Sequence, residues 1–417
     1  MTDLKQVDNA LAEILATIST LAHETIDLES ALGRVLAEDV LAEINLPPFA
    51  NSSMDGYAVR SADVAAASHD NPVLLHVVMD IPAGKPPQKP IQPGEAARIM
   101  TGAPMPDGAD AVIPVEDTDG SWDKQSALIN HVKVFRTVHT GDYVRPVGED
   151  IQAGSIVLES GTTIRPQELG ILAALGQGRV QVVKKPLVAI LSTGDELVNV
   201  DEPLTPGKIR DVNTHTLTGL VMSNGGQVYP LPIARDTLDD VRNLFRSALQ
   251  PKPDMLISSA GVSVGAADLI RTVLEELGEM NFWRINLRPG KPLTFGTIQG
   301  IPFFGLPGNP VSAMVTFDVL VRPALLKMAG LPLITNYIDA IVDEAIESDG
   351  RRSYLRVKLT LQDDGYHATT TGTQSSGALM SMVLADGLMI VPEGVKHVKA
   401  KTRLRVRVLK PIETPDW

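Results

Sequence analysis

The residues best suited to chemistry lie in short loops that are rich in small and charged side chains. The sequence STGDE at residues 192–196 combines a flexible backbone with two carboxylates that could orient a cation or the donor groups of a ligand. The loop at residues 258–268 places small residues before a predicted helix, where backbone N–H groups and the helix dipole favour an oxyanion. Asp268 ends this loop, and its carboxylate suits either a helix cap or a magnesium ion beside a phosphate. An ordinary capped turn explains the first loop equally well.

Two further loops offer a fixed geometry for an anion. The turn RPGKP at residues 288–292 carries Arg288 and Lys291 on a backbone that prolines restrain, so both charges are positioned in advance. The sequence LPGNPVS at residues 306–312 joins a predicted strand to a long helix, where Pro310 fits the first turn and Asn309 can cap it. A solvated basic turn and simple helix capping are the alternative explanations. The basic turn is not a P-loop, because Pro292 follows the lysine and no glycine stands at the required earlier position.

A serine hydrolase is the competing interpretation, because GVSVG at residues 261–265 has the pattern of a nucleophile elbow. An elbow serine follows its strand directly, whereas several small residues precede Ser263 here. The histidine of a triad should follow in the chain, and only His367 and His397 do, both within a predicted β region. Hydrolysis is therefore kept only as a minor alternative.

Composition excludes several classes of protein. The chain has 417 residues, 37 basic against 50 acidic side chains and a net charge of −13, which disfavours nucleic acid and acidic membrane surfaces as partners. It contains no cysteine, so disulfides, cysteine-ligated zinc, iron–sulfur clusters and a cysteine nucleophile are excluded. No apolar run approaches the roughly 18 residues of a membrane span, and the acidic start is unlike a signal peptide. We therefore expect a cytoplasmic protein that binds anions through local groups.

The elements that position these loops divide the chain by hydrophobic period. Apolar residues three to four apart predict a helix near the N-terminus, and a second helix is expected over residues 28–36. Short apolar runs between turns predict a small β-rich domain over residues 49–146. Residues 1–48 and 147–184 flank that domain and are expected to pack together as an elongated connecting domain.

Strand–helix alternation over residues 185–330 predicts a parallel α/β domain. The expected strands are 188–192, 227–231, 255–258 and 303–306, and the expected helices are 214–222, 238–249, 269–277 and 311–328. Asn213 and Asp236 are the expected N-caps of the first two helices. Ligands of such sheets bind beyond the carboxyl ends of the strands, so the loops described above are expected to meet there. Residues 331–417 are predicted to form a small β-barrel or sandwich, which makes the chain an α/β multidomain protein.

Taken together, the motifs resemble those of one family, the molybdopterin molybdenumtransferases, often called MoeA. The resemblance rests on NSSMDGYA (51–58), RIMTGAPMPDGADAV (98–112), VRPVGEDI (144–151), STGDEL (192–197), SSAGVSVGAAD (258–268), RPGKP (288–292) and LPGNPVSA (306–313). These motifs stand in the order that the family has. With the helical start and the β tail, the resemblance extends over nearly the whole chain.

The resemblance implies an elongated homodimer of four-domain subunits, with an α/β domain of the molybdopterin-binding type and a C-terminal β-barrel-like domain. It implies a magnesium-dependent transferase that inserts molybdate into adenylyl-molybdopterin and yields molybdenum cofactor and AMP. The implied partners are a molybdopterin adenylyltransferase and downstream molybdoenzyme maturation proteins. A non-catalytic scaffold or carrier of the same pathway is the alternative, although it would leave the loop carboxylates without a task. The sequence does not separate molybdate from tungstate.

The resemblance also implies roles for individual residues. The implied catalytic residues are Asp55, Thr101, Glu196, Asp236 and Asp268, of which the last three are the implied magnesium ligands. The implied substrate-binding residues are Arg145, Asp150, Ser192, Gly194, Ser263, Gly265, Arg288, Lys291, Pro292, Pro307, Asn309, Pro310, Ser312, Arg352 and Ser376. Arg284 and Arg288 stand where some members carry lysine, and this replaces a point charge with a planar fork of donors.

Overall fold

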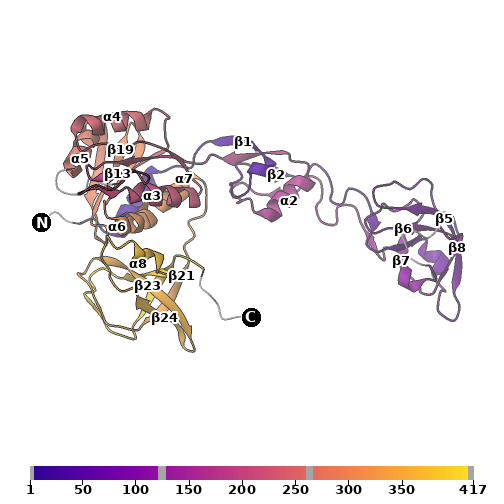
Figure 1. The fold of residues 1–417 in the computed structure, drawn as a ribbon. Helices are drawn as coiled ribbons and strands as arrows, with labels where there is room; N and C mark the ends of the chain where they lie inside the picture. The colour runs from indigo at the N-terminus through magenta and orange to yellow at the C-terminus, as the bar shows by residue number, and fades with distance from the viewer. Residues whose placement is uncertain (1–3, 121–127, 260–265, 412–417) are drawn as a thin grey trace. The chain divides into compact units, whose positions relative to one another are not determined.

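The computed structural model describes residues 4–120, 128–259 and 266–411, and its chain separates into two compact units (Figure 1). Unit 1 comprises Met1–Ile26, Gly33–Ala37 and Gln181–Trp417, and unit 2 comprises Asp27–Leu32 and Glu38–Val180. The chain passes between the units within strands β1 (His23–Asp27) and β11 (Arg179–Val183), and also after Leu32 and after Ala37. The finer domain limits given above stay predictions. In the part of the chain that is described, no helix is long and apolar enough to span a bilayer.

Unit 1 is built on a six-stranded sheet with the order β15-β12-β16-β20-β19-β17. Its strands are β12 (Leu187–Ser192), β15 (Gln227–Tyr229), β16 (Met255–Ser259), β17 (Gly278–Arg284), β19 (Pro292–Ile298) and β20 (Ile301–Leu306). Strands β15, β12, β16 and β20 run parallel, which confirms the four strands expected in this region. Strands β19 and β17 extend the sheet in antiparallel fashion and were not predicted. The β17 sequence GEMNFWR mixes polar and apolar residues, so it lacks the apolar run that marks the buried strands.

Helices cover both faces of this sheet (Figure 1). The first face carries α1 (Val7–Thr17), α3 (Val212–Ser223), α6 (Pro310–Thr316) and α7 (Arg322–Met328), and the second carries α4 (Leu238–Leu249) and α5 (Ala266–Leu277). Burial follows the alternation of the strands, since Val188 and Ile190 of β12 face α3 while Ala189 and Leu191 face α4. A π-helical segment, Phe317–Val321, joins α6 to α7, so the long helix expected over residues 311–328 is present.

Two helix caps differ from the sequence-based expectation. Helix α3 begins after Asp211, whose carboxylate accepts from the Thr214 backbone N–H at 3.0 Å, whereas Asn213 lies inside the helix. Helix α4 begins after Thr237, whose hydroxyl accepts from the Asp240 N–H at 3.2 Å. Both predictions missed by one or two residues, because several side chains able to cap stand together at each helix start. Asn213 and Asp236 are thereby left free of a capping role.

The start of the chain contains one α-helix. Val7, Ala10 and Ile14 of α1 are buried in the core that also holds the first face of the α/β sheet. The second helix predicted over residues 28–36 is wrong: only a short 3₁₀ turn, Leu28–Ser30, is present. Gly33 has φ +74°, a conformation that ends helical structure and that L side chains rarely adopt. The apolar spacing alone did not reveal this interruption.

The C-terminal part of unit 1 is a closed β-barrel. Its strands are β21 (Tyr337–Val342), β23 (Arg352–Gln362), β24 (Gly365–Thr370), β25 (Gly387–Val391) and β27 (Arg403–Val408). They follow the order β23-β24-β21-β27-β25, and a further pairing of β25 with β23 closes the ring. Strand β18 (Leu287–Arg288) pairs with β23 and so joins the basic turn to the barrel. The short elements β22 (Ile346–Glu347), β26 (His397–Val398) and α8 (Met380–Val383) complete this part. The predicted barrel is confirmed.

Unit 2 contains a five-stranded sheet with the order β7-β4-β6-β5-β8. Its strands are β4 (Gly56–Val59), β5 (Val73–Ile81), β6 (Glu95–Ile99), β7 (Ala111–Pro114) and β8 (His131–Val134). Tyr57, Leu75 and Val132 are among the residues that fill its core. The unit also holds the strand pairs β2 (Val40–Leu41) with β10 (Ile156–Leu158) and β3 (Asn51–Ser52) with β9 (Val144–Arg145), and helix α2 (Pro166–Ala174).

Candidate functional site

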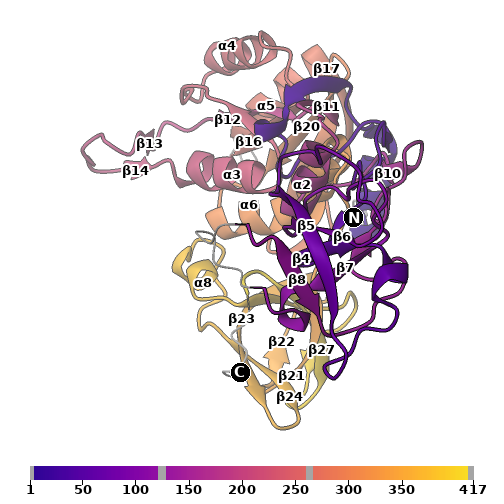
Figure 2. The ribbon, with the colours of Figure 1, turned by 90° about the vertical axis from the view of Figure 1, so that its right-hand side faces the viewer.

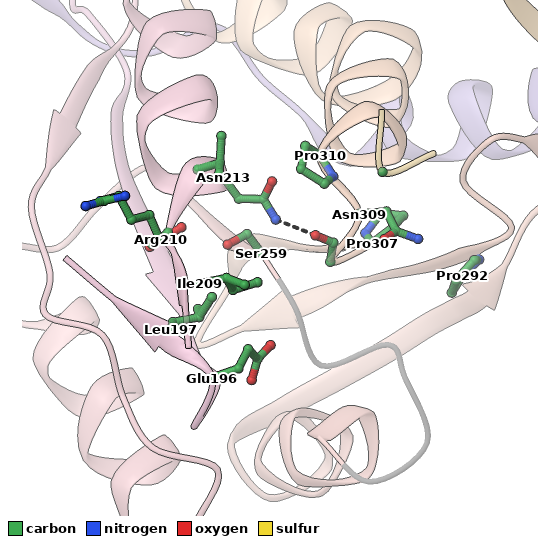
Figure 3. Close-up of a pocket in the computed structure, with 14 residues that line it drawn as sticks. Glu196, Leu197, Ile209, Arg210, Asn213, Ser259, Pro292, Pro307, Asn309 and Pro310 are labelled. Atoms are coloured by element: carbon green, nitrogen blue, oxygen red, sulfur yellow. Dashed lines mark hydrogen bonds between the residues drawn. The ribbon is translucent and has the colours of Figure 1, made fainter. Parts of the chain in front are cut away.

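A cavity of about 530 Å³ lies in unit 1 at the carboxyl edge of the parallel strands (Figure 3). Ser192, Ser259 and Leu306 end β12, β16 and β20 and stand side by side in register, so the loops that follow them open at one edge. Figure 2 shows that β13 (Leu197–Val198) and β14 (Ile209–Arg210), which also border the cavity, form the base of a projecting loop beside α3. The lining residues are Glu196, Leu197, Ile209, Arg210, Asp211, Val212, Asn213, Ser259, Pro292, Pro307, Gly308, Asn309, Pro310 and Gly377.

Buried polar atoms without partners gather at this edge of the sheet. The hydroxyl oxygens of Ser192, Ser258 and Ser259 and the amide oxygen of Asn213 are buried and have no hydrogen-bond partner among the described residues. Buried polar groups are nearly always satisfied, and each exception calls for an explanation. A ligand that offers donors and acceptors along this edge would satisfy these atoms.

The loop after β20 is held in place from two sides. Asn213 Nδ2 donates to the Gly308 carbonyl oxygen at 2.7 Å, which ties α3 to the loop (Figure 3). Asn309 precedes Pro310 at the start of α6, but its side chain makes no cap and instead donates to Ser376 Oγ at 3.0 Å. Asn309 occupies the N-cap position, but the predicted side-chain cap is absent, because the Val311 N–H donates to the Ser376 carbonyl oxygen at 3.1 Å instead. Ser376 thus lies at the cavity, while Ser312 is buried within α6.

A buried arginine, which the sequence did not predict as a site residue, contacts the barrel segment that includes Ser376. Arg356 on β23 is 1 % exposed, and it donates to Ser381 Oγ and to the Ser375 carbonyl oxygen, each at 3.1 Å. Within the described residues no carboxylate pairs with it. Burial, and next the positive charge of nearby Arg288, lower the pKa of Arg356 to about 10. The available signal was a single arginine inside an otherwise apolar strand segment, YLRV, where a buried charge is unusual.

The other predicted cations occupy different positions. Arg288 on β18 is half-buried, with Nη1 at 3.9 Å from an Asp349 carboxylate oxygen, and Lys291 is exposed. Pro292, which follows Lys291, lines the cavity. Arg352 does not line the cavity; its guanidinium donates to both carboxylate oxygens of Asp8, at 2.6 and 2.7 Å. The structure therefore brings Arg288, Pro292 and Arg356 toward one place and leaves Arg352 engaged elsewhere.

An acidic group flanks the cavity on the β12 side. The loop after β12 is joined to the loop after β15, because Gly194 N–H donates to the Ala234 oxygen at 3.1 Å and Ala234 N–H donates to the Ser192 oxygen at 2.9 Å. This pairing brings Asp195 and Glu196 close to Asp236. Burial raises the pKa of the Asp236 carboxyl, and the neighbouring Glu196 and Asp195 carboxylates raise it further.

These carboxylates are oxygen donors of the kind that magnesium prefers. Asp236 Oδ1 is buried, and the Asp236 side chain hydrogen-bonds with the Thr193 hydroxyl. Across residues 4–120, 128–259 and 266–411, no group of three or more His, Asp or Glu side chains is arranged to hold a metal ion. Asp268 is the third residue of α5, and its side chain lies outside the description, as do Ser263 and Gly265. Glu196 and Asp236 are thus two neighbouring carboxylates of the kind that binds magnesium together with waters and phosphate oxygens.

The remaining predicted residues lie in unit 2. Asp55 Oδ1 accepts from the backbone N–H of Thr101 at 2.7 Å and from its hydroxyl at 3.0 Å, so these two predicted residues do meet. Arg145 stands on β9 opposite Asn51, and both Arg145 and Asp150 are exposed. The cavity described above is formed entirely by residues of unit 1.

The described histidines do not support a hydrolase. His367 is 3 % exposed and lies between Asp343 and Asp364, at 2.7 Å from Nδ1 and 2.8 Å from Nε2 respectively. His397 pairs with Glu347 at 2.6 Å. Both belong to the barrel part and neither lines the cavity. GVSVG itself falls outside the described residues. Both ring nitrogens of His367 are bonded to carboxylates, which leaves neither to accept a proton from a serine hydroxyl.

Three family models match the chain in consecutive segments. One described as the MoeA N-terminal region (domain I and II) matches residues 5–176. One described as a probable molybdopterin binding domain matches residues 189–327. The third, described as the MoeA C-terminal region (domain IV), matches residues 339–407.

Individual proteins are similar over almost the full length. Molybdopterin molybdenumtransferase 2 of Mycobacterium tuberculosis is 36 % identical over 415 residues, which covers 97 % of this chain and 99 % of that protein. Molybdopterin molybdenumtransferase of Nostoc sp. is 39 % identical over 388 residues, which covers 90 % of this chain and 86 % of that protein. Among solved structures, a molybdopterin biosynthesis MoeA protein from Pyrococcus horikosii has a TM-score of 0.83 and 34 % identity, and the match covers 98 % of this chain and all of that one.

Proposed function

We infer the activity from one premise, namely that this chain belongs to the molybdopterin molybdenumtransferase family, also called MoeA. We propose that it inserts molybdate into adenylyl-molybdopterin and releases molybdenum cofactor and AMP. The observation that carries the proposal is the composition of the cavity edge. Buried hydroxyl and amide oxygens without hydrogen-bond partners among the described residues lie at this edge, and Glu196 lines the same cavity. Arg356, which pairs with no carboxylate among the described residues, contacts Ser375, whose neighbour Ser376 contacts Asn309 of the cavity.

The cavity edge suits the organic part of such a substrate. The unsatisfied oxygens of Ser259 and Asn213 can accept from the N–H groups of a pterin, and the serine hydroxyls can also donate to a phosphate. Hydrogen bonds of this kind fix the orientation of a ligand, because each wrong placement leaves a buried group unpaired. Ser192, Gly194, Pro307 and Pro310 are assigned to the same surface.

Arg356, Arg288, Lys291 and Ser376 are assigned to molybdate, a doubly negative oxyanion. Arg356 lacks a carboxylate partner among the described residues and lies near Arg288, so an anion between them would relieve the repulsion of two buried or half-buried charges. Ser376 joins this group because Asn309 fixes its hydroxyl at the cavity edge. Arg352 belongs to this set only if it leaves its pair with Asp8.

Magnesium is proposed to sit among Glu196, Asp236 and Asp268, where it would neutralise the phosphoanhydride of the adenylylated pterin. The raised pKa of Asp236 supports this assignment, because crowded, desolvated carboxylates favour a cation. Asp55 and Thr101 of unit 2 remain proposed catalytic residues, and Arg145 and Asp150 remain proposed substrate contacts. Two hydrogen bonds from Thr101 to the Asp55 carboxylate hold these two side chains together.

The reaction would proceed chiefly by positioning and electrostatics. Water adds to a phosphorus atom as the bond between the two phosphates breaks, so AMP leaves and the pterin keeps its own phosphate. The two dithiolene S–H bonds break as two Mo–S bonds form, and one oxygen of molybdate leaves with the two thiol protons as water. The chain's residues hold the oxyanion against those sulfurs and orient the phosphates, which favours both events in one bound geometry. We propose a cytoplasmic homodimer that receives its substrate from a molybdopterin adenylyltransferase and passes the product to molybdoenzyme maturation proteins.

Reconstitution tests this proposal against the scaffold alternative. Purified protein is mixed with adenylyl-molybdopterin, magnesium and molybdate, and AMP formation is measured beside activation of an apo-molybdoenzyme. The transferase forms AMP and activates the enzyme only when molybdate is present. A folded protein that binds the adenylylated pterin but forms no AMP and activates nothing would instead be a carrier or scaffold. Replacing molybdate with tungstate in the same assay measures the preference for either oxyanion.

A further inference from the structure

The segment that leads into the basic turn is held against the first residues of the chain. The backbone N–H of Lys5 donates to the Arg284 oxygen at 3.4 Å, and the N–H of Asn286 donates to the Lys5 oxygen at 2.8 Å. Lys5 also forms a parallel β-bridge with Ile285. The N-terminal segment thus acts as an extra strand beside residues 284–286, although it is about 280 residues away in sequence.

The barrel holds the same segment from its other side. Leu287 and Arg288 pair in parallel with Arg352 and Ser353, the first residues of β23. The N–H of Arg352 also donates to the Asn286 oxygen at 3.2 Å. Residues 284–288 therefore lie between the chain's N-terminal segment and β23, and the position of Arg288 depends on both neighbours.

One ion pair connects these two neighbours directly. Arg352 at the start of β23 donates from Nη1 and Nη2 to the two carboxylate oxygens of Asp8, at 2.6 and 2.7 Å. Asp8 lies in the first turn of α1, where the helix dipole also favours a negative charge. Glu393 approaches from the barrel, at 3.7 Å from Arg352 Nε, and accepts from the Val7 N–H at 3.5 Å. We call this ion pair the Asp8–Arg352 clasp, because it joins the two segments that flank residues 284–288.

We propose that the Asp8–Arg352 ion pair positions residues 284–288, so that Arg288 and Lys291 meet the substrate oxyanion in a fixed geometry. The proposal rests on the proposed function for the identity of that anion. Asp8 is 74 % exposed in its side chain, so the pair contributes little to overall stability. Its two parallel hydrogen bonds nevertheless fix orientation, which is what a positioning contact requires. Arg352 is on this account a positioning residue and does not touch the oxyanion.

A double-mutant cycle separates positioning from direct contact. We expect Asp8→Asn and Arg352→Gln each to raise the KM for molybdate in AMP release by about 5-fold, with kcat nearly unchanged. The double variant should be no worse than either single variant, because both remove the same pair. An Arg352→Gln effect far larger than that of Asp8→Asn, with the two effects multiplying in the double variant, would mean that Arg352 contacts the anion and would overturn the proposal.

Amide hydrogen exchange gives a readout that does not depend on activity. In both single variants we expect faster exchange at the amides of Lys5 and Asn286. Their N–H groups form the hydrogen bonds between the N-terminal segment and residues 284–286. The matched control is Arg242→Gln, which breaks another two-bond pair, with Glu276 at 2.8 and 2.6 Å, on α4 and α5. The control should leave both amides and the molybdate KM unchanged. Unchanged exchange in Asp8→Asn and Arg352→Gln would refute the positioning role of the pair. If exchange is faster in both variants but the wild type itself forms no AMP, the positioning role is upheld and the proposed function is refuted.

Discussion

Arg356 shows how a single side chain can mark a site. A guanidinium at 1 % exposure that donates only to a hydroxyl and a carbonyl among the described residues has given up water without gaining a counter-ion. Its lowered pKa has the same origin, since burial and the nearby Arg288 both oppose a positive charge. Such a buried charge lowers the stability of the free protein, and it is expected where an anionic ligand pairs with it. Activity and stability should therefore respond in opposite directions to its replacement.

Asp236 should show the same opposition between stability and activity. Its folded-state pKa is raised, so its ionisation weakens the fold, and stability is lost as pH rises through that pKa. We expect Asp236→Asn to be at least as stable as the wild type at pH 7, while AMP release falls by about 100-fold because the cation loses a ligand. Thermal unfolding and the magnesium dependence of AMP release measure both effects.

The control for that substitution is a nearby acid without the same surroundings. Asp239 on α4 is 89 % exposed in its side chain and pairs only at 3.3 Å with Arg242. Asp239→Asn should leave both the magnesium dependence and the stability close to the wild type. Wild-type turnover in Asp236→Asn at the same magnesium concentration would remove Asp236 from the proposed metal site.

His367 provides a pH-dependent contribution to the barrel. Asp343 and then Asp364 raise its pKa through hydrogen bonds above the ordinary value near 6.5. The stabilisation is fully present below pH 6.5 and is lost as pH rises through the raised pKa. The free energy of unfolding of the wild type, measured in urea between pH 6 and 9, should therefore approach that of His367→Gln as pH increases. A constant difference over this range would show that the histidine does not change its charge there.

At the scale of elements, helix α4 begins directly after Thr237, the residue that follows Asp236. Thr237 accepts from the Asp240 N–H and so satisfies one free donor of the first turn. Thr237→Ala should lower the free energy of unfolding by about 1 kcal/mol, whereas Thr237→Ser, which keeps the hydroxyl, should lower it much less. Urea unfolding at pH 7 compares the two. Equal losses would show that the hydroxyl does not cap the helix.

The elements also show what could be predicted from the sequence. Apolar runs that alternate with amphipathic helices identified the four parallel strands and the helices between them, because burial on both faces leaves a strong pattern. The helix expected over residues 28–36 failed at Gly33, whose conformation overrides the apolar spacing. The caps of α3 and α4 were misplaced because Asp211, Asn213, Asp236 and Thr237 are all chemically able to cap.

The candidate site was predictable where its residues follow strands directly. Glu196, Asn309 and Pro310 follow β12 or β20 closely, and the shared edge of a parallel sheet brings them to one cavity. The Asp8–Arg352 pair could not be predicted, because it joins the barrel to a residue more than 300 positions away in the chain. Arg356 was missed although YLRV carries an arginine in an apolar strand segment, because the burial of its side chain is a property of the folded barrel. The spacing of Arg352 and Arg356 on β23 did not indicate which of them contacts Ser375, next to the Ser376 that meets Asn309.

At the scale of the whole molecule, the α/β sheet and the barrel share one compact unit, and the site draws on both. Asn309, at the sheet edge, bonds to Ser376 of the barrel part, and β18 continues the basic turn into β23. The activity should accordingly depend on a barrel residue as strongly as on the sheet loops. Arg356 lies on barrel strand β23, so its replacement tests whether activity depends on the barrel.

The most direct test is the molybdate dependence of AMP release by Arg356→Met. Methionine removes the charge but fills a similar space, so the variant should be at least as stable as the wild type in thermal unfolding. The wild type should release AMP at a rate that rises with molybdate, and the variant should need about 10- to 100-fold more molybdate for the same rate. A stable Arg356→Met protein with the wild-type molybdate dependence would contradict the assignment of the oxyanion to this site.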